Sequence, residues 1–407
     1  MSSIVEAASA SPSLQGSSTG NDLVVSLLSV VPKLQVVLQS SDRVLNAVNT
    51  ISTSLMGPAI HSRTFPDNLT PDLLHLFEQI AQQGVAAKPW KKDVGDAFNN
   101  PRFFACNSDA MQSGWFPLLA KWTLSDKDRM PELLSRLAAP STAGIMFGVG
   151  ANAARLEADR KTQSTLRRAI ILLLACSQDT FTDSLTLILE KIVDLCAADP
   201  SSSPSSTTRA EIFMVFRALL LSFSSIHLTA LWPTLNNTLQ TALATCLSAS
   251  HDRETYNNLS LLQACKLLDL LTTLEPDEFQ LHEWLYITNT VDAVYRPTDL
   301  SPTALTDEIA EEIGAESLEQ SFHASQTTAT SPHRPSGLRQ PFLSALSIDG
   351  ADAKAMARDD FVRSMLQPFF SQLSMYAYEA TYEMGVPDIE ACRRSLLQDV
   401  SDEGTMA

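Results

Sequence analysis

Apolar residues, most of them leucines, recur at three- and four-residue steps along most of this 407-residue chain. The first run is Leu23, Leu27, Val30, Leu34 and Leu38. This spacing places the side chains on one face of an α-helix. The chain has only 14 glycines, whereas sheet-rich proteins usually need more glycine for tight turns and bulges. The sequence therefore predicts an all-α fold with a leucine-rich core.

Amphipathic segments of helical length follow one another through the centre of the chain. The clearest are 166–173, 185–196, 212–223, 228–247 and 261–271. Thr70 and Pro71 mark the start of an earlier helix, as a cap and a first helical residue. Paired helices at intervals of roughly 40 residues are typical of helical repeats. We therefore expect an elongated α-solenoid of stacked helical hairpins, similar to HEAT or armadillo arrays.

Composition shifts divide the chain into four predicted parts. Residues 1–20 are rich in serine and alanine and are predicted to be a disordered leader. The helical solenoid spans 21–297, with a flexible loop at 199–208. An acidic, Ser/Thr/Pro-rich flexible segment follows at 298–352, and a C-terminal helical segment at 353–400. Pro32 and Pro368 fall inside helical patterns and should bend or divide them.

Charge and cysteine content exclude several functional classes. The net charge is −17, and the residues from Asp299 onward hold 18 acidic and 7 basic residues, a net of −11. Nucleic-acid binding needs clustered Lys and Arg, so we expect no nucleic-acid partner. The six cysteines are scattered and are predicted to be buried, reduced and structural. The longest apolar run, Ala169 to Cys176, is too short to span a bilayer.

Short matches to catalytic motifs lack the context that their chemistry needs. The G-x-S-x-G match at 16–20 lies in the predicted leader, and the G-x-G-x-x-A match at 148–153 lacks a βαβ unit. His282-Glu283 begins like a zinc-protease motif, but Tyr286 stands where the second histidine is required. The paired carboxylates at 311–312 and 359–360 are interpreted as solvated. We therefore predict no enzyme, no cofactor and no metal.

A partner-binding surface is the main functional hypothesis from the residues themselves. Leucines at 267, 274 and 281 fall at heptad spacing, next to a leucine-rich helix and an aromatic segment. Tryptophan and tyrosine dominate the energetics of protein interfaces. The alternative interpretation, which is the better one for any single residue, is core packing between hairpins. The candidate interface residues are Leu228, Trp232, Leu235, Leu239, Phe279, Leu281, Trp284, Tyr286 and Tyr295.

A second hypothesis is direct binding of lipid headgroups. Lys88, Lys91, Lys92 and Arg102 form a small basic cluster near Trp90 and Phe103. Basic residues beside aromatic ones can contact anionic headgroups such as phosphoinositides. The acidic neighbours at 93 and 96 weaken this interpretation.

Four segments resemble, in the same order, the C-terminal region of the Dopey family of large trafficking proteins. They are KPWKKDVGDAFNNPRFF (88–104), RAEIFMVFRALLLSFSSIHLTALWPTLNNTLQ (209–240), LLQACKLLDLL (261–271) and PDEFQLHEWLYITNTVDAVYRP (276–297). Together these similarities cover most of residues 23–383, and their overall character is fungal.

The resemblance implies a helical, leucine-zipper-like region of a protein that binds peripherally to Golgi (trans-Golgi network) and endosome membranes. It also implies two partners, a large Arf-exchange-factor-like scaffold protein and a P4-type phospholipid-flippase ATPase. The implied role is a non-enzymatic scaffold in vesicle-mediated transport between endosomes and Golgi, with possible self-association. Members of the family are several times longer, so we expect this chain to be a fragment or the product of a truncated gene.

Overall fold

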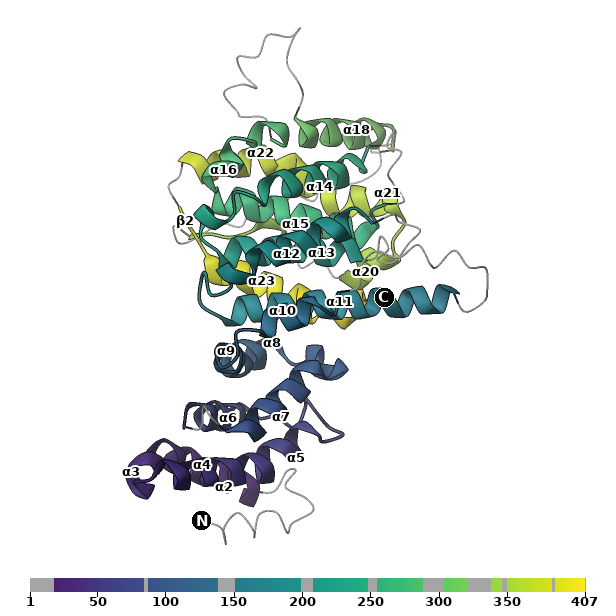
Figure 1. Cartoon of the computed structure of the whole chain (residues 1–407). Coiled ribbons are helices and arrows are strands. Elements are labelled where there is room, and N and C mark those ends of the chain that lie inside the picture. The colour runs from purple at the N-terminus through teal and green to yellow at the C-terminus, as the bar shows by residue number, and fades with distance from the viewer. Residues whose placement is uncertain are drawn as a thin grey trace. The chain divides into compact units, whose positions relative to one another are not determined.

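The computed structural model describes residues 18–83, 87–137, 151–198, 208–247, 255–287, 304–320, 338–345, 350–382 and 385–406. In these ranges the chain is almost entirely helical (Figure 1). The strands among them are β1 (Leu338–Arg339) and β2 (Val386–Pro387), which pair in parallel with Leu338 opposite Val386. The predicted all-α class is confirmed. Residues 1–17, 199–207 and 288–303 carry several predictions that lie outside the described part.

Contacts within the chain separate two compact units. Unit 1 comprises Met1–Leu133, Ile171–Thr180 and Val400–Glu403, and unit 2 comprises Leu134–Ile170, Phe181–Asp399 and Gly404–Ala407. The sequence placed residues 21–297 in one solenoid domain, and this range contributes to both units. In each unit, helices pack on helices in layers, as expected of a solenoid-like fold.

Unit 1 is built around α6 (Pro71–Gln83), which contacts α2, α4, α7 and α9. Its inner face carries Leu74, Phe77 and Ile80, which are buried. The predicted cap is confirmed, because Leu73 N donates to Thr70 Oγ1 at 3.3 Å. The other helical elements of unit 1 are α2 (Ser18–Val30), η1 (Val31–Lys33), α3 (Leu34–Leu38), α4 (Ser41–Ile51), η2 (Ser52–Met56), α5 (Gly57–Ile60), α7 (Lys88–Asn99), η3 (Pro101–Ala105), α8 (Ser108–Ala110), η4 (Met111–Trp115), α9 (Phe116–Leu124) and most of α10 (Arg129–Leu134).

Prolines shape the helices at recurrent positions. Pro32 lies in the 3₁₀ turn η1, directly after α2, so the predicted interruption is confirmed. Pro58, Pro117 and Pro368 each follow a π-helical turn by two residues. Proline lacks an N–H and its ring crowds the carbonyl four residues earlier, so a wider turn accommodates it without breaking the helix.

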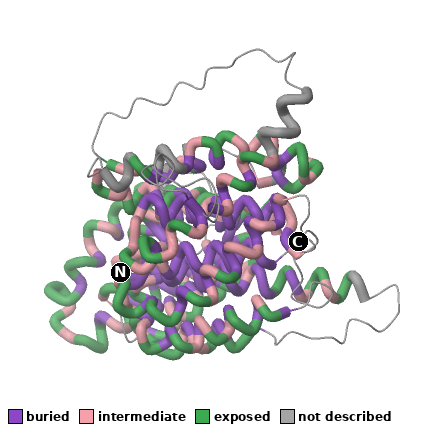
Figure 2. Tube along the Cα trace, turned by 90° about the horizontal axis from the view of Figure 1, so that it is seen from above, coloured by how far each residue is buried: buried purple, intermediate pink, exposed green. Residues whose placement is uncertain are grey.

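Unit 2 is centred on α15 (Asn258–Leu274), which contacts α13, α14, α19, α20 and α22. Fourteen of its 17 residues are buried, and Figure 2 shows buried residues gathered on the inner helices. The other elements of this unit are most of α11 (Ala151–Ala175), α12 (Thr182–Cys196), α13 (Arg209–Ser222), η7 (Ser225–His227), α14 (Trp232–Ala244), α16 (Asp277–Gln280), η8 (Glu283–Leu285), α18 (Leu305–Gln320), α19 (Phe342–Ala345), α20 (Gly350–Ala355), α21 (Arg358–Phe361), η10 (Val362–Leu366), α22 (Gln367–Tyr382), most of α23 (Ile389–Ser401) and much of η11 (Glu403–Thr405).

The predicted heptad seam through Leu267, Leu274 and Leu281 does not form. α15 ends at Leu274, because Glu275 adopts a left-handed conformation with φ 48° and Pro276 follows. Leu281 therefore lies after a separate short helix, α16. The three leucines do not share one helical face.

Within the range 298–352, which the sequence predicted to be a flexible segment, the described residues include α18, α19 and β1. Ile309 of α18 is fully buried, and Thr306 N donates to Tyr286 O at 3.1 Å. Asp307 and Glu308 lie in the first turn of α18, where negative charge favours the helix dipole. The acidic composition that suggested flexibility therefore stabilises a helix start.

Candidate functional site

Most of the predicted interface residues form the core of unit 2. Those that are buried are Leu228, Trp232, Leu235, Leu239, Phe279 and Tyr286. Tyr286 stacks on Phe279 with ring centroids 6.1 Å apart. Its hydroxyl donates to the backbone O and the Oδ1 of Asn236, at 3.2 and 3.1 Å, and burial raises the Tyr286 pKa. Tyr286 thus links the end of η8 to α14, and the six buried residues have almost no exposed surface to offer a partner.

Two of the predicted residues, Leu281 and Trp284, are exposed. The exposed fractions are 71% for Leu281 and 58% for Trp284. Leu281 directly follows α16 and Trp284 lies in η8, and in sequence both fall between the buried Phe279 and Tyr286. We call this pair the Leu281–Trp284 surface. Tyr295, the ninth predicted residue, lies outside the described residues.

The anchors on either side fix the Leu281–Trp284 surface in place. His282 Nδ1 is 2.8 Å from Glu278 O, and Tyr286 N donates to Glu283 O at 2.9 Å. Burial, followed by the nearby charge of Glu275, raises the pKa of Glu283, which lies between the two apolar residues. Leu281 and Trp284 are therefore exposed apolar side chains on an ordered segment, with Glu283 between them in sequence.

The predicted basic cluster is only partly available to a ligand. Lys88 and Lys92 of α7 are exposed, and Lys91 Nζ lies 5.9 Å from the centre of the Trp90 ring. Arg102 donates a hydrogen bond to Arg63 O at 2.6 Å and thereby stabilises the loop that precedes α6. The neighbouring aromatic residues at 90 and 103 are buried, with exposed fractions of 1% and 0%. They cannot insert into a membrane without unfolding.

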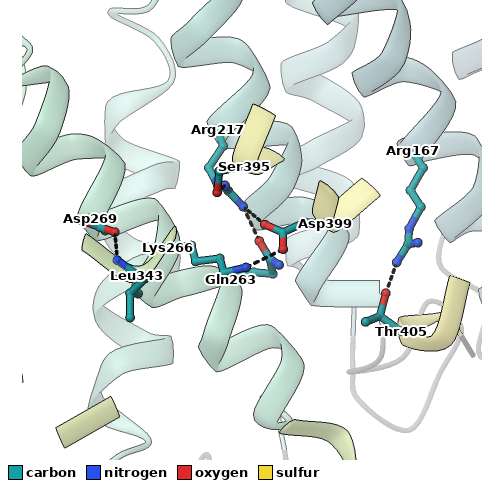
Figure 3. A network of polar contacts seen from close by, with 9 residues as sticks. All are labelled: Arg167, Arg217, Gln263, Lys266, Asp269, Leu343, Ser395, Asp399 and Thr405. Atoms are coloured by element: carbon teal, nitrogen blue, oxygen red, sulfur yellow. Dashed lines mark hydrogen bonds and ion pairs between the residues drawn. The ribbon is translucent and has the colours of Figure 1, made fainter. Parts of the chain in front are cut away.

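A buried ion cluster that the sequence did not reveal lies in unit 2 (Figure 3). Arg217 of α13 donates to Asp399 Oδ2 of α23 at 2.6 Å, and Lys266 Nζ of α15 lies 2.5 Å from Asp399 Oδ1. Arg217 also donates to Gln263 Oε1 at 2.7 Å and to Ser395 Oγ at 3.2 Å. Burial alone would raise the pKa of Asp399, but Lys266 and Arg217 hold it below its usual value. The cluster fastens the C-terminal helix to the two central helices.

A second buried ion pair joins α11 to α13. Arg167 Nη2 is 3.0 Å from Glu211 Oε1, with side chains 0% and 1% exposed, and it also donates to Thr405 Oγ1 at 2.6 Å. Burial raises the pKa of Glu211 despite the guanidinium beside it. Arg217 and Lys266 both form ion pairs with Asp399, whereas Glu211 pairs with Arg167 and is also influenced by the charge of Lys354.

Asp269 shows a third use of a buried carboxylate. Its Oδ1 and Oδ2 accept from Phe342 N at 2.8 Å and from Leu343 N at 2.7 Å. The side chain of a core helix thus satisfies the amides at the start of α19. These polar groups hold the helices together and are not arranged around a cleft.

In the part of the chain that the structure describes, the candidate catalytic motifs lie in helices and turns. Of the 16–20 match, the described residues 18–20 begin α2, and of the 148–153 match, residues 151–153 begin α11. Glu283 lies in a 3₁₀ turn, and Tyr286 is buried. Asp359 and Asp360 are exposed at the start of α21, as predicted.

The cysteines are free thiols, and five of the six are buried, as predicted. Cys196 is partly exposed and lies near Thr238. Burial raises the pKa of Cys106 and of Cys392 to about 12, and that of Cys176 to about 11. The thiolate, which is the reactive form, is therefore disfavoured at these positions. Among the described helices, none combines the length and apolar character needed to cross a bilayer.

The fold and these surfaces define a class of protein, an all-α protein with a layered helical core and an exposed apolar patch. A family model described as DOP1 C-terminal matches residues 2–383. The chain therefore belongs to the DOP1 (Dopey) family, as its resemblance indicated. This family match does not point to an enzyme family.

Named relatives agree with this assignment. The chain is 47% identical to Protein dop1 of Emericella nidulans over 387 residues, which cover 95% of this chain and 20% of the relative. It is 23% identical to Protein DOP1 of Saccharomyces cerevisiae, covering 81% of this chain and 18% of the relative. With Protein DOP1B of Xenopus laevis the identity is 24%, over 52% of this chain and 10% of the relative. The chain thus spans about a fifth or less of these relatives. No solved structure matches it.

Proposed function

We propose that this chain is a non-enzymatic helical scaffold in vesicle-mediated transport between endosomes and the Golgi. The observation that carries the proposal is the DOP1 C-terminal match over residues 2–383. The layered helices of each unit support it, because stacked helices present extended surfaces for protein partners. In this role the chain is peripheral to trans-Golgi network and endosome membranes.

The proposed direct partner is the large Arf-exchange-factor-like scaffold protein that the family resemblance implies. The Leu281–Trp284 surface is its proposed contact, since an ordered, exposed tryptophan beside a leucine matches the composition of interface hot spots. The phospholipid-flippase ATPase that the family resemblance implies is the second proposed partner. Self-association of the chain is the competing use of the same apolar surface.

The test is affinity capture from fungal cytosol with the tagged full chain as bait. We expect the exchange-factor-like scaffold to be enriched, and Leu281→Ala/Trp284→Ala bait to lose it. Ile226→Ala is the matched control, because Ile226 is 78% exposed in the same unit but lies on η7. Light scattering of the purified chain measures its molar mass and so shows whether the chain self-associates without the scaffold. Recovery of chaperones without the scaffold would contradict the proposal.

A second candidate is direct recognition of phosphoinositide headgroups by Lys88, Lys91 and Lys92. The exposure of Lys88 and Lys92 favours it, whereas Arg102 is occupied with the Arg63 carbonyl. Flotation with phosphoinositide vesicles tests it, comparing Lys88→Glu/Lys92→Glu with Lys127→Glu, an exposed lysine elsewhere in unit 1. An equal bound fraction for the two variants would remove the lysines of α7 from consideration.

A further inference from the structure

The fold brings together three potential metal ligands that are remote in sequence. His61 directly follows α5, and its backbone N–H donates to Gly57 O at 2.9 Å. Asp93 and Asp96 lie one turn apart on α7, so their carboxylates share a face of that helix. α5 packs against α7. All three residues belong to unit 1.

The donor atoms are close to the separations of a coordination shell. His61 Nε2 lies 3.9 Å from Asp93 Oδ1 and 3.7 Å from Asp96 Oδ2. One ligand atom from each residue lies within 4.8 Å of the other two. Tetrahedral zinc, with bonds of about 2.0–2.2 Å, holds its donor atoms roughly 3.4 Å apart. Small side-chain rotations would therefore bring the three atoms onto one ion.

Asp93 is held in a way that suits a metal ligand. It is only 8% exposed, and Ser52 Oγ donates to its Oδ2 at 3.3 Å. That bond leaves Oδ1 directed towards His61. Ligating carboxylates are commonly oriented by a hydrogen bond of this kind. The side chains of His61 and Asp96, which are 56% and 42% exposed, leave the position open for an ion to enter.

We propose that His61, Asp93 and Asp96 bind one Zn²⁺ ion, with water in the fourth position. One imidazole nitrogen and two carboxylate oxygens fit zinc, whereas Ca²⁺ and Mg²⁺ prefer shells made of oxygen atoms. The bound ion would tie the end of α5 to the middle of α7. The rival explanation is a metal-free surface cluster in which His61 and the nearby Lys92 interact electrostatically with Asp93.

The test is calorimetric titration of the chelator-treated full chain with ZnCl₂, together with thermal unfolding at each zinc concentration. We expect saturable binding of one ion and a rise in the unfolding temperature. His61→Ala and Asp96→Asn change exposed residues, so circular dichroism should show intact helices. Each should weaken binding by more than about tenfold, and Ser52→Ala by about tenfold.

His75→Ala provides the matched control. His75 also lies in unit 1 and pairs with a carboxylate one turn away, Glu78, at 3.4 Å, but it is not part of the three-ligand group. This variant should bind zinc like the unaltered chain. The proposal is overturned if the unaltered chain binds no zinc, if His61→Ala and Asp96→Asn leave the affinity unchanged, or if Mg²⁺ or Ca²⁺ binds as tightly as zinc.

Discussion

Arg217 and Asp399 are 182 residues apart in sequence, yet they form a 2.6 Å ion pair that joins α13 to α23 inside unit 2. Their side chains are only 4% and 12% exposed. Lys266 contacts the same carboxylate from α15. Two cations and one anion therefore meet where the C-terminal helix packs on the central helices.

Breaking this cluster should destabilise the protein strongly. Removing Asp399, the single anion of the cluster, leaves the buried Arg217 and Lys266 cations without compensation, which costs about 3–5 kcal/mol. We expect Asp399→Ala to lower the free energy of unfolding by that amount in urea denaturation. Glu157→Ala is the control, because the Glu157–Lys161 pair is exposed and its loss should cost at most about 0.5 kcal/mol. Equal losses in the two variants would contradict a structural role for the buried cluster.

Asp399 should contribute to the pH dependence of the free energy of unfolding. The pKa of its carboxyl lies below the usual value, because Lys266 and Arg217 outweigh the effect of burial. A lowered folded-state pKa gives stability that is present above the unfolded pKa, about 3.9, and is lost as pH falls through the folded pKa. The stability difference between the unaltered chain and Asp399→Asn should be constant near neutral pH and shrink below about pH 4. A difference that grows on acidification would contradict this sign.

The contact between α6 and η4 makes Gly114 sensitive to substitution. A Cβ at position 114 would lie 2.6 Å from Leu74 Cδ1 and 2.9 Å from Leu74 Cβ. Gly114→Ala should therefore cost about 1–3 kcal/mol through overpacking, although alanine is the better helix former. Thermal unfolding measures the loss, with Ser113→Ala, an exposed neighbour, expected to stay within about 0.5 kcal/mol. A more stable Gly114→Ala variant would show that the two elements pack less closely than described.

Substitutions of Phe279 and Trp284 should show that protein stability and partner binding depend on different side chains near α16. Phe279 is 1% exposed, so Phe279→Ala should lower the unfolding free energy by about 3–5 kcal/mol. Trp284 is 58% exposed, so Trp284→Ala should leave the unfolding free energy nearly unchanged while weakening partner binding by about 2 kcal/mol. Denaturation and a binding titration on both variants test this division. Loss of stability in Trp284→Ala would assign the tryptophan to the core.

The sequence predicted the fold class because leucine spacing is a local property that survives in the structure. It predicted α15 less well. It did not reveal that Ser260, Gln263 and Asp269 are buried together with the leucines. Their polar groups bond within the core, as when Asp269 accepts from Phe342 N and Leu343 N. A central helix surrounded by others has no solvated face, and a periodic pattern cannot show this.

The candidate surfaces depend on contacts between residues that are distant in sequence. Phe279 and Trp284 look equally suited to an interface in sequence, but in the structure Phe279 is buried and stacks on Tyr286, whereas Trp284 is exposed. The His61–Asp93–Asp96 group was missed for the same reason, because its spacing matches no local metal motif. Pro276 after Leu274 was the one local signal that argued against a heptad seam.

Direct titration of purified exchange-factor-like scaffold with the purified full chain tests the central claim most directly. We expect saturable binding that Leu281→Ala/Trp284→Ala weakens by tenfold or more and that Ile226→Ala leaves unchanged. The absence of binding, or affinity that is the same for all three proteins, would contradict the proposal that this DOP1-family chain acts through the Leu281–Trp284 surface.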